Sequence, residues 1–204
     1  MVQASDRASA TIEDDEIDRL RALTWRLLAR FLAAPPDAAA LEATARLGEP
    51  ETELGRALSL LGRIASKTNP AEAEEEYHAL FIGVGRGELV PYASFYRTGF
   101  LNEKPLALLR QDLAELGIAR AEGNPEPEDH IASLCEVMAG LAEGRFGTAG
   151  LATQQRFFDR HLAPWAGRFF ADLEAARSAR LYQPVGTVGR LFVEIERTAF
   201  ALAA

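Results

Sequence analysis

The chain has 204 residues, of which 48% are apolar and 25% are charged, and 22 basic against 30 acidic side chains give a net charge of −8. This size and composition are typical of one soluble globular domain, and the negative charge argues against nucleic acid and anionic lipid surfaces as main partners. No segment approaches the roughly 18 consecutive apolar residues of a transmembrane helix, so we expect no stable membrane insertion.

The N-terminal segment, residues 1–11, is expected to be a disordered tail, and residues 12–204 are expected to form one helical domain. The start of the chain has no apolar segment followed by a cleavage pattern, which favours a cytoplasmic protein. Thr11 and Asp14 resemble a capping box that begins the first helix, and Pro35-Pro36 must end it. The apolar stripe of this helix is predicted at Ile17, Leu20, Leu27 and Phe31, with Trp25 off the stripe.

The next part of the chain predicts short helices and one long loop. Helices are expected at about 37–47 and 51–66, and Asn69-Pro70 caps a further helix whose acidic run we interpret as a solvated face. Residues 82–96 contain Gly83, Gly85, Gly87 and Pro91, which predict a loop. The glycine spacing does not match a nucleotide-binding fingerprint, because a helix and not a strand precedes it.

The second half has a regular helical pattern. One helix is predicted from Pro105 to a stop at Gly117, another from about residue 126 to Glu143, and two more on either side of Pro164. The last helix has the clearest apolar stripe: Val185, Val188, Phe192, Ile195, Ala199 and Leu202. Because no alternating strand pattern occurs, we predict an all-α, single-domain bundle of about eight to ten helices.

The most informative stretch is Glu126-Pro127-Glu128-Asp129-His130. Pro127 favours the first position of a helix, so Glu126 is the predicted N-cap and Asp129 the third helical residue. His130 lies in line with the apolar stripe of this helix, and the neighbouring carboxylates favour its protonated form. The simplest interpretation is a capped helix start with a hydrogen-bonded histidine at its edge.

The same stretch resembles the E-P-x-D-H motif of the TorD/DmsD-type chaperones for redox-enzyme maturation. Three further segments resemble motifs of that family in the same order: residues 77–81 its aromatic-x-x-Leu-Phe box, residues 90–94 its Pro-Tyr-Glu-Ser segment, and residues 161–165 its H-L-x-P-W stretch. The chain departs from the family at Ala93, where glutamate is usual, so a role for that carboxylate is not carried over. The resemblance covers about residues 75–200 and also implies a TorD-like helical fold.

The resemblance implies a cytoplasmic chaperone and no enzyme. Such proteins bind the twin-arginine signal peptide or the apo form of a molybdenum-cofactor oxidoreductase, assist cofactor insertion, and delay export until folding is complete. The client would be a dimethyl-sulfoxide-reductase-type enzyme or a formate dehydrogenase, and the sequence does not distinguish the two. The family includes monomers and domain-swapped dimers, as well as members with weak guanine-nucleotide binding, and the residues indicate none of these. No cofactor or metal of the chaperone itself is expected.

A signal-peptide groove needs apolar walls and carboxylates for the arginines. The candidate walls are Tyr77, Leu80, Phe81, Tyr92 and Phe95, and the candidate polar contacts are Glu126, Glu128, Asp129 and His130. Leu80 and Phe81 are adjacent and cannot both face one groove, so core packing is an equal alternative for them. The alternative function is a small helical metal-binding protein or enzyme that uses Asp129 and His130. The three histidines, His78, His130 and His161, show no ligand spacing that supports it.

Overall fold

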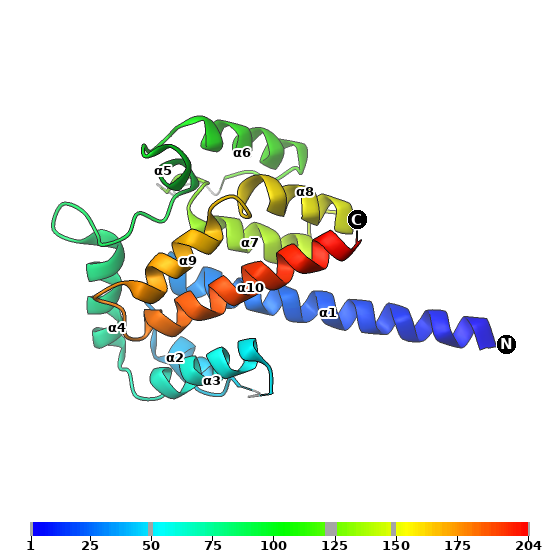
Figure 1. Cartoon of the computed structure of the whole chain (residues 1–204), viewed down its shortest axis with the longest axis horizontal. Helices are drawn as coiled ribbons and strands as arrows, with labels where there is room; N and C mark the ends of the chain where they lie inside the picture. The colour runs from blue at the N-terminus through cyan, green and yellow to red at the C-terminus, as the bar shows by residue number, and fades with distance from the viewer. Residues whose placement is uncertain (1, 49–50, 121–125, 148–149, 204) are drawn as a thin grey trace.

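The computed structural model describes residues 2–48, 51–120, 126–147 and 150–203, with side chains from residue 16 onward. Within these ranges the chain forms ten α-helices, one π-helical turn and a single isolated β-bridge, so the predicted all-α bundle of eight to ten helices is confirmed (Figure 1). In the same ranges no helix is long and apolar enough to cross a membrane. That residues 12–204 form one domain stays a prediction.

The helices are joined by short turns, except around the site described below. In chain order they are α1 (Val2–Ala33), α2 (Ala38–Thr44), α3 (Glu53–Ala65), α4 (Pro70–Tyr77), the π-helical turn η1 (His78–Ile82), α5 (Ala93–Thr98), α6 (Lys104–Glu115), α7 (Ile131–Ala142), α8 (Leu151–His161), α9 (Ala166–Ala175) and α10 (Tyr182–Ala203). Helix α1 packs against α7, while α10 packs against α9 and α3, and α1 and α10 run through the middle of the molecule (Figure 1).

Helix α1 differs from its prediction in its start and in part of its apolar stripe. It begins at Val2, so the predicted start at Thr11 is wrong, whereas the disordered tail at residues 1–11 stays a prediction, and residue 1 lies outside the described part of the chain. Ile17 and Leu20 are 55% and 57% exposed, whereas Trp25, taken to lie off the stripe, is completely buried. The predicted stripe is therefore confirmed at Phe31, which is 0% exposed, and at the partly buried Leu27, and it is wrong at Ile17 and Leu20, which face solvent.

The same error occurs at the end of α10, where the predicted stripe residues Ile195 and Leu202 are 46% and 84% exposed. The buried face instead contains Glu196, which is 0% exposed. Its carboxylate accepts two hydrogen bonds from the Arg21 guanidinium, at 2.6 and 2.8 Å, and one from the Trp25 indole at 3.2 Å. The stripe is confirmed at Val185, Val188 and Phe192, which are buried, and a search for apolar residues alone could not find the buried ion pair that joins α10 to α1.

Two helix ends that depend on local capping, at Asn69 and at Gly117, are where the sequence predicts them. The Asn69 side chain accepts the N–H of Glu72 at 3.0 Å, and the Glu72 carboxylate accepts the N–H of Asn69 at 3.1 Å, so a complete capping box begins α4. Gly117 follows α6 with φ of +69°. The predicted loop at 82–96 is partly wrong, because α5 begins at Ala93 inside it.

Candidate functional site

The segment 126–130 does not begin a helix as predicted. Helix α7 begins at Ile131, and His130 is its N-cap, with Nδ1 accepting the N–H of Ala132 at 3.2 Å. The residues before it are held instead by a tertiary contact: the N–H of Ala93 donates to the Asp129 carbonyl at 3.0 Å, and the N–H of Ile131 donates to the Pro91 carbonyl at 2.9 Å. These bonds form an antiparallel bridge at His130, and the residues before it form a tight turn closed by the N–H of His130, which donates to the Pro127 carbonyl at 3.2 Å, in place of the predicted first helical turn.

The bridge joins two of the motifs found in the sequence. Tyr92 of the 90–94 segment pairs with His130 of the 126–130 segment, and the centroids of their rings lie 5.0 Å apart in an edge-on contact. The Tyr92 hydroxyl also donates a hydrogen bond to the Glu126 carboxylate. Residues 34 and 38 positions apart in sequence are thus fixed next to one another by backbone and side chain together.

Asp129 is 1% exposed, although we expected it to be an accessible polar contact. Its carboxylate accepts hydrogen bonds from the N–H of Ser94, at 2.8 Å, and from the Ser94 hydroxyl. Asp129 therefore caps α5 and not its own helix. A ligand would reach this carboxylate only if the bonds to Ser94 broke, so the structure favours a positioning role for Asp129.

His130 is 8% exposed, and this burial lowers its pKa to about 4. The carboxylates of Glu126 and Asp129 act in the opposite direction but do not outweigh desolvation. The predicted preference for the protonated form is therefore wrong. Since Nδ1 accepts a hydrogen bond, the neutral ring carries its proton on Nε2.

Five of the nine predicted site residues line one pocket of about 170 Å³: Tyr77, Phe81, Tyr92, Glu126 and His130. The rings of Tyr77 and Phe81 have centroids 5.0 Å apart and form an aromatic wall. The pocket is smaller than the roughly 300–1,000 Å³ of sites for drug-sized ligands and cofactors. Its size suits one long side chain of a partner.

The other four predicted residues lie elsewhere. Leu80 is 0% exposed and belongs to the core, which resolves the alternative for the adjacent Leu80 and Phe81. Phe95 lies under the guanidinium of Arg86, 4.9 Å from its ring centroid, in a different pocket. Partial burial would raise the pKa of Glu128, but the hydrogen bonds from Arg110, at 2.8 and 3.0 Å, outweigh it and the pKa is lowered. Asp129 binds Ser94 as described.

The pocket carries negative charge on an aromatic and apolar surface. Glu126 and Glu136 are its charged lining residues, and both are exposed. Burial and the nearby Glu126 raise the pKa of Tyr92, so its hydroxyl stays protonated and continues to donate. Sequence reasoning missed Glu136 and Ser133, although their spacing of three, on an otherwise apolar helix, places both on one face of α7. The arrangement suits a guanidinium, which binds carboxylates and stacks on aromatic rings.

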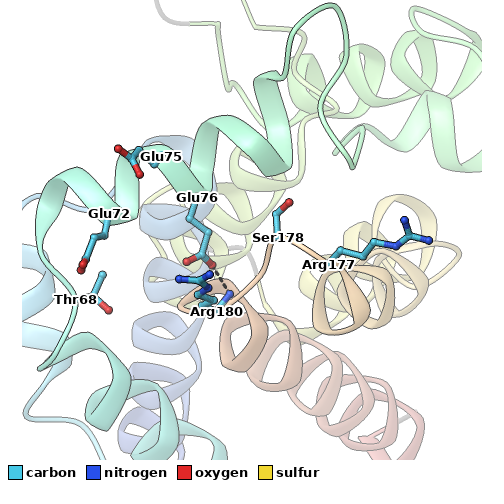
Figure 2. Close-up of a pocket in the computed structure, with 7 residues that line it drawn as sticks. All are labelled: Thr68, Glu72, Glu75, Glu76, Arg177, Ser178 and Arg180. Carbon is cyan, nitrogen blue, oxygen red and sulfur yellow. Dashed lines mark hydrogen bonds between the residues drawn. The ribbon is translucent and has the colours of Figure 1, made fainter.

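A second, polar pocket of about 420 Å³ lies where α4 meets the turn between α9 and α10 (Figure 2). Glu76 points at this turn, and its carboxylate accepts the backbone N–H groups of Arg180, Leu181 and Tyr182 at 2.7, 3.1 and 2.8 Å. The interpretation of the acidic run as a solvated face is therefore wrong for Glu76, which caps the start of α10. Because this carboxylate is used within the fold and Arg177 and Arg180 also line the pocket, we assign no ligand to it.

A metal site at Asp129 and His130 finds no support in the geometry. The Asp129 carboxylate binds Ser94, and His130 Nδ1 binds the backbone of its own helix. Among the residues that the structure describes, no group of three or more His, Cys, Asp or Glu side chains is placed to hold a metal ion.

Comparison with known proteins identifies the family. The family model described as nitrate reductase delta subunit matches residues 44–171. The chaperone protein TorD of Vibrio cholerae (serotype O1, El Tor) is 25% identical over 154 residues, which cover 71% of this chain and 70% of that protein. The TorD protein of Aliivibrio fischeri is 31% identical over 108 residues, and the probable Tat proofreading chaperone DmsD of Haemophilus influenzae is 32% identical over 111.

The last two alignments cover 48% and 53% of this chain and about half of each relative, 50% and 52%. Among solved structures, one described as a redox enzyme maturation protein from Archaeoglobus fulgidus superposes with a TM-score of 0.56 at 18% identity, covering 85% of this chain and 93% of that one. At this identity the superposition supports the fold alone. Family model, curated relatives and fold agree: the chain belongs to the nitrate reductase delta subunit family, and the relatives named here are chaperones and not enzymes.

Proposed function

We propose that this protein is a cytoplasmic chaperone that binds the twin-arginine signal peptide, or the apo form, of a molybdenum-cofactor oxidoreductase. It would assist cofactor insertion and delay export until the client has folded. The observation that carries the proposal is the pocket in which two motifs distant in sequence meet: aromatic side chains of Tyr77, Phe81 and Tyr92 beside the carboxylates of Glu126 and Glu136.

The chemistry of this pocket matches one arginine of the signal peptide. The guanidinium would contact the two carboxylates and stack on an aromatic ring, with a contribution of about 1.5–3 kcal/mol for each charge-assisted hydrogen bond. The net charge of −8 also attracts a cationic segment from a distance. Asp129 and His130 act indirectly in this proposal, because they fix the backbone that carries Tyr92 and Glu126.

The test is calorimetry with a synthetic twin-arginine signal peptide of an oxidoreductase encoded beside this gene. We expect binding that weakens as salt rises, because the arginines meet carboxylates, together with a negative heat-capacity change from apolar contacts. Glu126→Gln keeps the acceptor for Tyr92 and removes the charge, so affinity should fall about tenfold, or about 1.4 kcal/mol, at low salt.

Glu74→Gln is the matched control, because Glu74 is exposed on α4 and does not line this pocket. It should leave affinity unchanged, and neither substitution should change the melting temperature by more than a degree or two. Absence of binding of any such peptide or client at micromolar concentration would contradict the proposal. Elemental analysis of the purified protein addresses the metal-binding alternative, which a stoichiometric bound metal would favour.

A further inference from the structure

A long apolar groove is lined by residues of α1 and of the α2 and α3 region. In Figure 1 α2 and α3 are the helices drawn below α1. The volume of the groove is about 730 Å³, and six of its lining residues are leucines: Leu20, Leu23 and Leu27 of α1, Leu47, and Leu54 and Leu58 of α3. Leu27, Leu54 and Leu58 are partly buried against the core, whereas the other three are exposed. Leu20 is 57% exposed, Leu23 is 52% exposed and Leu47 is 36% exposed.

The leucines of α1 form a row distinct from its core face. Leu20, Leu23 and Leu27 follow one another at steps of three and four, which places them on one side of the helix. The completely buried Trp25 lies off this row and packs into the core. Contiguous exposed apolar surface of this kind is uncommon on a soluble protein and is typical of an interaction site.

Two of the three charged residues that line the groove are paired within the chain, so its apolar floor suits an uncharged occupant. Arg26 pairs with Glu143, and Arg30 pairs with Asp37 at 3.1 Å. The other charged residue in the lining is Glu51. The groove thus differs from the pocket at Glu126, where carboxylates face the ligand.

The groove and the pocket both reach the last turn of α1, although they share no lining residue. Arg30 and Phe31 line the groove, and Ala33 lines the pocket. From Leu20 to Phe31 the groove follows α1 over eleven residues (31 − 20), or about 16 Å at roughly 1.5 Å per residue. An apolar helix of about eleven residues has the same length, and the apolar region of a signal peptide has about 7–15 residues.

We infer that the groove holds the apolar region of the signal peptide as a helix antiparallel to α1. This inference rests on the proposed function. With an arginine in the pocket beside Ala33, the residues that follow cross the last turn of α1 and continue past Phe31 toward Leu20. One peptide then uses both surfaces, its cationic part at the carboxylates and its apolar part on the leucines.

The experiment compares the double variant Leu20→Gln, Leu23→Gln with the control Leu151→Gln, Ile195→Gln. The control residues are 45% and 46% exposed and do not line the groove, and glutamine preserves helix propensity in both proteins. The probe is a synthetic peptide with two consecutive arginines followed by an apolar segment of about eleven residues. A second peptide carries serines in place of half the apolar residues.

We expect the groove variant to bind the first peptide at least tenfold more weakly than wild type and the control to bind it equally well. The loss should persist at high salt, unlike that of Glu126→Gln, and should shrink toward zero with the serine peptide. If wild type binds the peptide and the groove variant binds it equally, the inference is wrong while the proposed function stands. If wild type binds no peptide, the proposed function itself fails. If wild type is a dimer and the groove variant is a monomer by light scattering, a second copy covers the groove and the inference is overturned.

Discussion

Replacing Asp129 by alanine should destabilise the fold far more than loss of an ordinary helix cap. The carboxylate is 1% exposed and accepts two hydrogen bonds from Ser94, which is 0% exposed. Hydrogen bonds to a charged group contribute about 1.5–3 kcal/mol each, and buried donors left without a partner add a desolvation cost. We therefore expect Asp129→Ala to lower the free energy of unfolding by about 3–5 kcal/mol, against about 1 kcal/mol for an exposed cap.

The assay is urea unfolding followed by circular dichroism, with the free energy taken from linear extrapolation. Asp129→Asn serves as the control, because its amide oxygen can still accept the N–H of Ser94; we expect it to lose about half as much stability. The double variant Asp129→Ala, Ser94→Ala should be less destabilised than the sum of the two single variants, since it removes acceptor and hydroxyl donor together. A loss below about 1 kcal/mol for Asp129→Ala would refute the assignment of Asp129 as the buried cap of α5.

Two further perturbations test the electrostatics of the core. His130 has a pKa of about 4 in the fold against about 6.5 when unfolded, so the unfolded chain binds the proton more tightly and stability should fall as pH drops from 6.5 toward 4. The loss of unfolding free energy attributable to His130 is at most about 3 kcal/mol. In the variant His130→Gln, the unfolding free energy measured between pH 7 and pH 4.5 should therefore depend less on pH. Glu196→Ala leaves the partly buried Arg21 guanidinium without its main acceptor and should lower stability by about 3–5 kcal/mol. Thermal melting checks this, and the exposed Glu194→Ala should differ from wild type by less than about 0.5 kcal/mol.

The fold class and several helix ends could be predicted because they depend on local signals. Asn69-Pro70 begins α4 through side chains within three residues, and Gly117 ends α6 through its own backbone conformation. The stripes of α1 and α10 were predicted correctly only in part, because Ile17 and Leu20 of α1 and Ile195 and Leu202 of α10 are exposed. The buried contact between these helices includes Glu196, which meets Arg21 from 175 positions away, and hydrophobic periodicity contains no information about such a pair.

The sequence predicts several residues of the candidate site but not the backbone arrangement that brings them together. Its motifs drew attention to Tyr92, Glu126 and His130, which do lie together. Local rules for proline nevertheless placed a helix start at Glu126, because they omit the backbone bridge between the two motifs. Glu136 was missed for a different reason, since an exposed glutamate on a helix is common and its proximity to Glu126 appears only in the folded chain.

The π-helical turn η1 makes the shape of the pocket sensitive to the gain or loss of a single residue within that turn. The N–H of Gly83 donates to the His78 carbonyl five residues earlier, at 2.7 Å, so this turn holds one residue more than an α-helical turn. Within this turn Phe81 faces the pocket while Leu80 faces the core. Deleting a single residue here would shorten the turn to an ordinary α-helical one, and each residue on one side of the deletion would move by one position, or about 100° around the helix axis. Relatives that differ by one residue at this position would therefore present a different pocket wall even if every aromatic side chain were retained.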